Sequence, residues 1–167
     1  MALRDHLKNC TSKSSLLNLI IEQNLWNELS LLIFDDDYDV AWRSIWMLNE
    51  APRNKLDSMK LDIDKIIKRS MVRGSSQQRE VLKFLSRTPI PEKSLGLYYD
   101  WTQSLWIDIQ NIPSVRIAAL RAITRVIGIH PELKSEIQPF LTTEHFDTLS
   151  PGIKKQVLKM LNELELN

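Results

Sequence analysis

Apolar residues recur along this chain at intervals of three and four, the spacing of one face of an α-helix. The alternation of apolar and polar residues that marks strands is nearly absent, and Gly is scarce, with 4 residues. Most Pro residues fall between the apolar-periodic segments, where Pro ends one helix or starts the next. The pattern predicts an all-α protein. The expected helices are 14–23, 24–34, 39–50, 60–72, 75–87, 95–109, 114–128, 131–143 and 150–164, with a short one near 2–9.

Alternate helices of this series resemble one another. Aligning VAWRSIWML, QQREVLKFL, VRIAALRAI and IKKQVLKML places a closing Leu or Ile at 48, 85, 123 and 161, in steps of 37, 38 and 38 residues. A second apolar column, three positions earlier, holds Ile45, Leu82, Leu120 and Leu158. Columns three residues apart lie on one helix face, so each copy offers the same stripe to its neighbour. The sequence therefore predicts a repeated helix–turn–helix unit.

The segment SVRIAALRAITRVIGIHPELKSEIQPFL resembles a HEAT repeat: a small residue, Val-Arg, an Ala-rich first helix and a Pro-led second helix. Within it, Pro139 predicts a kink or a break in the second helix, and Arg116 occupies the HEAT-type arginine position, where it is expected to pair with a neighbouring repeat. The resemblance implies a right-handed α-α superhelix of the HEAT/armadillo type, with about four helical pairs and a capping helix. We expect one domain over 1–167, with an N-terminal pair at 14–34, repeats at 36–72, 73–109 and 110–149, and a capping helix at 150–167.

The segment NELSLLIFDDDYDVAWRSIWMLNEA is similar to the opening of small bacterial HEAT-like proteins, some of which are labelled adenylosuccinate lyase. That resemblance implies lyase activity as a third-ranked function. Lyases of that superfamily carry a Gly/Ser-rich catalytic loop with Met, Lys and Asn, and no segment of this chain matches it.

Charge and composition favour a protein partner. Lys and Arg number 22 against 21 Asp and Glu, a formal net charge of +1, whereas domains that wrap nucleic acid usually carry a clear basic excess. The single Cys excludes an intramolecular disulfide and fits a reducing compartment. The first residues lack an apolar signal segment, and the apolar clusters are too short to cross a bilayer. We expect a cytoplasmic protein that does not enter a membrane.

No motif predicts catalysis, a cofactor or a metal site. The run DDDYD at 35–39 begins like a calcium-binding loop, but Val40 and Trp46 stand where that loop needs Gly and Glu. A turn in which Asp39 caps the next helix is the simpler interpretation. The three His residues are scattered and Cys10 has no adjacent cation, so neither a metal centre nor a nucleophile is predicted.

Aromatic residues on the 95–109 helix suggest a binding surface. One apolar stripe already serves packing, and Tyr99, Gln103 and Trp106 lie on a flank of it. Second helices of solenoids usually line the concave face. The pattern favours packing between repeats for Tyr99 and Trp106, with an exposed recognition patch that includes Gln103 as the alternative.

A basic column gives a second candidate surface. Lys83, Arg121 and Lys159 are separated by steps of 38 and 38 residues, so they occupy the same position in three repeats. They form either a basic ladder along one edge or a solvated face.

The sequence thus predicts a non-enzymatic module that binds an unidentified protein or peptide along its concave face. Nucleic-acid binding, or base repair of the HEAT-like alkylpurine DNA glycosylase type with exposed Trp and Arg and a catalytic Asp, is the alternative. The oligomeric state is left open.

Overall fold

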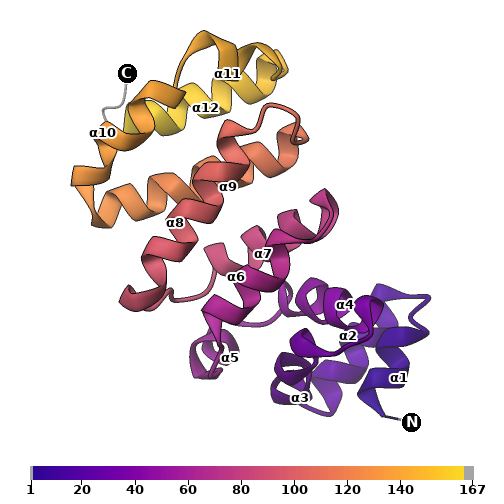
Figure 1. Cartoon of the computed structure of the whole chain (residues 1–167). Helices are drawn as coiled ribbons and strands as arrows, with labels where there is room; N and C mark the ends of the chain where they lie inside the picture. The colour runs from indigo at the N-terminus through magenta and orange to yellow at the C-terminus, as the bar shows by residue number, and fades with distance from the viewer. Residues whose placement is uncertain (1, 164–167) are drawn as a thin grey trace.

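The computed structural model describes residues 2–163, and all regular structure in that range is helical. The helices follow one another as a curved stack that runs from the N-terminus at the lower right of Figure 1 to the C-terminus at the upper left. The first part holds α1 (Leu3–Lys8), α2 (Lys13–Glu22), α3 (Trp26–Leu31) and the 3-10 turn η1 (Leu32–Phe34). The middle holds α4 (Tyr38–Leu48), α5 (Arg53–Ser58), α6 (Ile63–Met71), α7 (Ser75–Ser86) and α8 (Glu92–Ile107). The last part holds α9 (Pro113–Ile129), η2 (Pro131–Leu133), α10 (Lys134–Ile137), η3 (Gln138–Phe140), α11 (Thr143–Asp147) and α12 (Pro151–Glu163).

The helices form two layers. The first-helix layer consists of α4, α7, α9 and α12, and each of these packs against the next. The second-helix layer contains α6 and α8, which pack against each other and also against α7 and α9 respectively. Among the described residues, the closely packed helices of the two layers are therefore successive members of the series, as in a helical repeat stack. The prediction of an all-α repeat fold is confirmed, while the hand of the superhelix and the repeat boundaries stay predictions.

The aligned apolar columns form the core of the first-helix layer. All four members of the closing column are buried: Leu48, Leu85, Ile123 and Leu161. The second column is buried in three copies, but Leu158 on α12 is 50% exposed. Among the described helices, α12 packs on the first-helix layer from one side only, through α9. Burying a large aliphatic side chain contributes roughly 2 kcal/mol, so this stripe is a main source of stability.

Two arginines fix the register between first helices. Arg87 and Arg125 lie one repeat apart, and each reaches back to the end of the preceding first helix. Arg87 donates a hydrogen bond to the carbonyl of Ala51, beyond α4, at 2.8 Å. Arg125 donates to the carbonyl of Leu85, on α7, at 3.0 Å. Carbonyls at the end of a helix attract cations, so these arginines add hydrogen-bond donors at the end of the preceding first helix.

The predicted helix at 131–143 is split. Its helical part, α10, ends at Ile137, and Pro139 lies in η3. Pro has no amide hydrogen and its ring clashes with the preceding turn, so the prediction of a break is confirmed. The short helices α5 and α11 were not predicted, because α5 buries only Leu56 and α11 buries no residue fully. Such segments carry no apolar periodicity.

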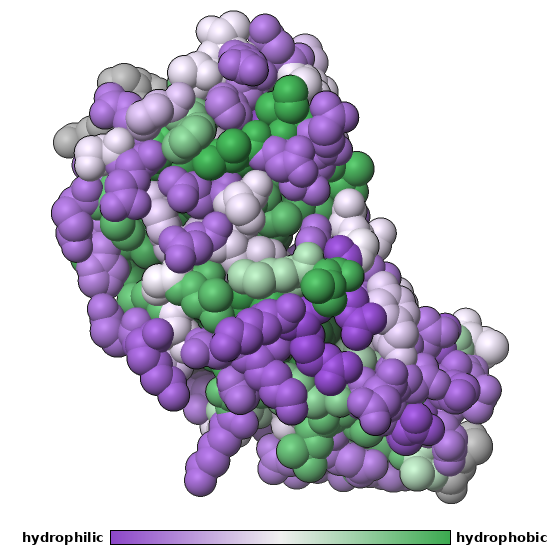
Figure 2. All heavy atoms as spheres, viewed as in Figure 1, coloured by the Kyte–Doolittle hydropathy of each residue, from purple (hydrophilic) through white to green (hydrophobic). Residues whose placement is uncertain are grey.

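Surface character varies along the stack. Hydrophilic side chains crowd the middle of the face seen in Figure 2, around α6. Within residues 2–163, none of the helices combines the length and the apolar character that crossing a membrane requires.

Candidate functional site

The aromatic side chains of α8 are packed inside the stack. Trp106 is 0% exposed and Tyr99 is 4% exposed, so they pack inside the stack and the alternative of an exposed recognition patch is wrong. Trp106 donates its indole hydrogen to the carbonyl of Phe140 at 3.0 Å, and its ring lies 6.0 Å from that of Phe146. Both partners belong to the following repeat. Gln103, the third predicted member, is half-buried.

Arg116 also serves the packing of repeats. Its side chain is fully buried and donates hydrogen bonds to the carbonyl of Trp106 at 3.1 Å, to Thr148 Oγ1 at 2.6 Å and to the carbonyl of His145 at 2.6 Å. Burial lowers the pKa of Arg116, although a guanidinium keeps its charge in proteins. Of these partners, Trp106 belongs to the preceding predicted repeat, whereas Thr148 and His145 lie in the predicted repeat of Arg116 itself. This arginine is not available to a ligand.

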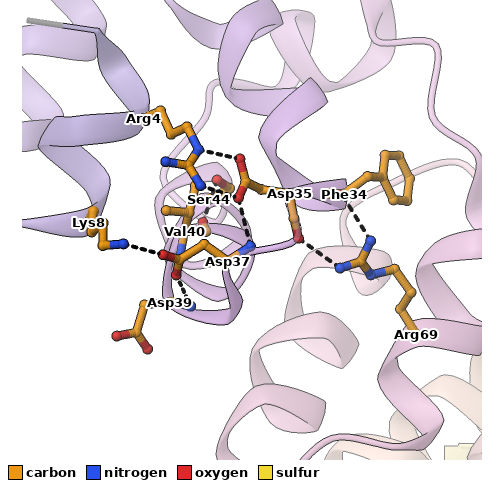
Figure 3. A network of polar contacts seen from close by, with 9 residues as sticks. All are labelled: Arg4, Lys8, Phe34, Asp35, Asp37, Asp39, Val40, Ser44 and Arg69. Atoms are coloured by element: carbon orange, nitrogen blue, oxygen red, sulfur yellow. Dashed lines mark hydrogen bonds and ion pairs between the residues drawn. The ribbon is translucent and has the colours of Figure 1, made fainter.

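The acidic run before α4 is a structural junction (Figure 3). Arg4 of α1 donates two hydrogen bonds to the Asp35 carboxylate, at 2.8 and 3.0 Å, and Lys8 Nζ lies 2.8 Å from Asp37 Oδ2. The hydrogen bond from Arg4 lowers the pKa of Asp35, and that from Lys8 lowers the pKa of Asp37. These carboxylates therefore hold α1 to the stack.

Asp37, and not Asp39, caps α4. The Asp37 carboxylate accepts hydrogen bonds from the amides of Asp39 at 3.1 Å and Val40 at 3.4 Å. The prediction that Asp39 is the capping residue is wrong, because α4 begins one residue earlier than expected.

The basic column is exposed. Lys83, Arg121 and Lys159 project from α7, α9 and α12, which pack side by side in the first-helix layer. Arg121 donates to Gln156 Oε1 at 3.1 Å, and Lys159 lies 4.0 Å from Glu163. The three side chains are thus on successive helices of one layer, and their role in binding stays a prediction.

Two grooves separate successive elements on the other side of the stack. The first, which we call the basic groove, lies between α6 and α8 and is lined by Asp62, Asp64, Lys65, Lys68, Arg69, Val72 and Lys93. The second, the acidic groove, lies between α8, the end of α9 and the η2–α10 segment. Its lining residues are Glu92, Leu95, Gly96, Tyr99, Asp100, Val126, His130, Glu132, Leu133 and Glu136.

The acidic groove has a cavity of about 340 Å³, within the range of small-ligand pockets. Its α8 wall is a single helix face, because the contributing residues are spaced by three and four positions. On the opposite wall, His130 Nδ1 lies 3.2 Å from Glu132 Oε1. His130 Nε2 lies 3.3 Å from Glu92 Oε1, although the two are not aligned for a hydrogen bond. Hydrogen bonds from its own backbone amide and from His130 lower the pKa of Glu132.

Tyr99 forms part of the floor of the acidic groove. Its hydroxyl is buried and has no hydrogen-bond partner among residues 2–163. Burial, together with the negative charges of Glu136 and Asp100, raises the pKa of Tyr99 to about 12. The hydroxyl is therefore neutral at physiological pH and can donate or accept one hydrogen bond.

The sequence model of the HEAT repeat domain matches residues 3–164. The chain belongs to the HEAT repeat family. No curated protein and no solved structure matches the chain at a significant level.

HEAT repeats form helical scaffolds, and the family is typically non-enzymatic. Within residues 2–163, no three His, Cys, Asp or Glu side chains are placed to hold a metal ion. The polar contacts of this HEAT repeat chain at Arg116 and at Asp35 connect helices to one another.

Sequence reasoning missed the acidic groove. On α8, the spacing of Glu92 and Asp100 does place them on one face, and that signal was present in the sequence. The facing residues Glu132 and Glu136 join them only because η2 and α10 fold back beside α8. No local pattern in the HEAT repeat sequence predicts that approach.

Proposed function

We propose that this HEAT repeat chain is a non-enzymatic scaffold that binds an extended segment of a partner protein along its second-helix face, which we expect to be concave. The observation that carries the proposal is the succession of two open grooves of opposite charge between α6, α8 and the η2–α10 segment. Complementary charge gives a protein interface its specificity and its register.

The charges in these grooves are available to a partner. In the basic groove, Lys68 and Lys93 are exposed and have no ion-pair partner among residues 2–163. In the acidic groove, Asp100 and Glu136 are likewise exposed and unpaired within that range. Charged side chains that form no ion pair within the fold are free to bind a charged group of another molecule.

The groove spacing sets the form of the partner. Packed helices lie roughly 8–10 Å apart, and an extended chain advances roughly 3.3 Å per residue. A segment that crosses both grooves therefore needs an acidic residue and a basic residue about three positions apart.

Site-specific photo-crosslinking in cells of the source organism tests this proposal. A photoreactive amino acid is placed at Val72 or Lys93 in the basic groove, and at Lys83 or Arg121 in the first-helix layer as the matched control. We expect one protein adduct of the same mass from both groove positions and none from the control positions. Adducts confined to Lys83 and Arg121 would assign binding to the basic column, and adducts of equal yield from all four would remove the second-helix face as the binding surface.

The exposed basic column supports nucleic-acid binding as a second candidate. Lys83, Arg121 and Lys159 all lie on the surface of one layer. Fluorescence anisotropy with duplex DNA decides this point, and no binding at about 50 mM salt would exclude it. The base-repair form of the idea has less support, because Trp106 and Arg116 are buried in contacts between repeats.

A further inference from the structure

We infer that the acidic groove receives a Lys or Arg side chain of the bound segment. The inference rests on the proposed scaffold function and adds to it the chemistry of one contact. Three independent features of the groove, namely its charge, a buried hydroxyl and its shape, point to this occupant.

The charge around the groove is negative and uncompensated. Four of its ten lining residues are acidic, none is Lys or Arg, and His130 is the one other titratable group beside Tyr99. Elsewhere in the described chain, acidic residues such as Asp35 and Glu50 form ion pairs with Arg or Lys. Clustered carboxylates repel one another, and a cation between them relieves that repulsion.

The buried Tyr99 hydroxyl supplies the second feature. Buried polar groups in proteins nearly always have a hydrogen-bond partner, yet this hydroxyl, on a side chain only 4% exposed, has none among residues 2–163. An ammonium carries three donors and a guanidinium carries five, so either can donate to the hydroxyl and still bind a carboxylate. The hydroxyl of the adjacent Tyr98 is also unpaired but lines neither groove, which makes it a matched control.

The shape of the groove fits a long side chain with a charged end. Leu95, Val126 and Leu133 give it apolar walls, against which methylene groups of Lys or Arg can pack. Gly96 keeps the α8 wall low, and a Cβ atom built there has no neighbour within 4 Å. A side chain added at Gly96 therefore enters the groove without disturbing the fold.

An NMR titration tests the inference directly. The full chain, labelled with ¹⁵N, is titrated with Nα-acetyl-lysine N-methylamide and with the arginine analogue, and the norleucine analogue serves as a neutral control. We expect saturable shifts in the millimolar range at amides of 92–100 and 130–136 with either cationic probe, and none with norleucine. Equal shifts with norleucine, shifts spread over the whole chain, or no shifts would overturn the inference.

Paired variants separate the three features. Replacing both Glu132 and Glu136 by Gln should weaken binding of the lysine probe roughly tenfold, because two charged contacts are lost. The control pair Asp62→Asn and Asp64→Asn in the basic groove should leave it unchanged. Gly96→Met should abolish binding by filling the cavity.

The tyrosine pair gives a readout that a purely structural role would not move. Tyr99→Phe should weaken binding of the lysine probe several-fold while Tyr98→Phe has no effect. Equal effects from both variants would mean that the hydroxyl of Tyr99 does not contact the probe.

Failure of this inference is distinguishable from failure of the proposed function. Crosslinks at Val72 without binding of the cationic probes would keep the scaffold function and reject the cation receptor. Probe binding without crosslinks at Val72 or Lys93 would keep the receptor and reject the second-helix face as the partner surface.

Discussion

At the scale of single residues, the side chain of Arg116 connects helices inside the fold. It is fully buried, and its guanidinium hydrogen-bonds to α8 and to the α11 region. The guanidinium carbon also lies 4.8 Å from the centroid of the Trp106 ring. A buried cation is tolerated only when it is hydrogen-bonded, and here each of the three guanidinium nitrogens donates to a partner. Its position in the HEAT-type pattern made this role predictable from the sequence.

Replacing Arg116 should therefore be costly. We expect Arg116→Met to lower the free energy of unfolding by about 3 kcal/mol, because it removes charged hydrogen bonds and leaves buried carbonyls unpaired. Urea denaturation followed by circular dichroism measures the loss. The exposed Arg121→Met serves as the control and should change stability by less than about 0.5 kcal/mol. Similar losses in both variants would mean that the Arg116 contacts contribute little.

The two buried tyrosine hydroxyls make the opposite prediction. Tyr98→Phe and Tyr99→Phe should each leave stability unchanged or raise it, by up to about 1 kcal/mol, since an unpaired buried hydroxyl is removed. Thermal and urea denaturation of both variants would show this. A loss of stability in Tyr99→Phe alone would reveal a hydrogen bond made by that hydroxyl within the folded chain.

At the scale of elements, α1 depends on the ion pairs at its surface. It presents two buried side chains, Leu3 and Leu7, and its remaining attachment is polar. Arg43 of α4 donates to the carbonyl of Leu7 at 2.7 Å, and Arg4 binds Asp35. Helices this short are not stable alone, so their place in the stack depends on such contacts.

Acid should therefore loosen α1 first. The pKa of Asp35 is lowered in the folded chain by Arg4, so the stability it contributes is present above the unfolded pKa of roughly 3.9 and is lost as pH falls through the lower folded value. Denaturation measured between about pH 6 and pH 2 should show a less steep acid dependence for Asp35→Asn than for the unmodified chain. Parallel curves would indicate that this ion pair is absent in solution.

The helices that bury a long apolar face could be predicted from the sequence, whereas those that bury little could not. The helices α4, α7 and α9 repeat one stripe, and their predicted ends lie within two residues of the observed ones. The short α5 depends on one buried side chain, and its formation follows from tertiary packing that no local pattern reports. Packing of Trp106 between repeats was expected, but its contact partners were not, because the η3–α11 segment that covers it is irregular.

At the scale of the whole molecule, charge is separated although it balances overall. A formal net charge of +1 conceals a basic groove beside α6 and an acidic groove beside α10. The repeat step predicted the stack of helices, but the grooves arise between repeats and take residues from segments about thirty positions apart, such as Tyr99 and Glu132. Apolar periodicity within a helix gives no information on contacts between residues so far apart in the sequence. The two grooves could therefore be found only from the packing of the helices.

Selection of peptides on the intact chain tests whether its second-helix face binds an extended segment through a basic side chain. A displayed library of random peptides is selected against the unmodified chain and, in parallel, against Gly96→Met, with Gly128→Met as the matched control because a Cβ at Gly128 also has no neighbour within 4 Å. We expect peptides that carry Lys or Arg with an acidic residue about three positions away, enriched on the unmodified chain and on Gly128→Met and lost on Gly96→Met. Peptides without a basic residue, or equal enrichment on Gly96→Met, would contradict it.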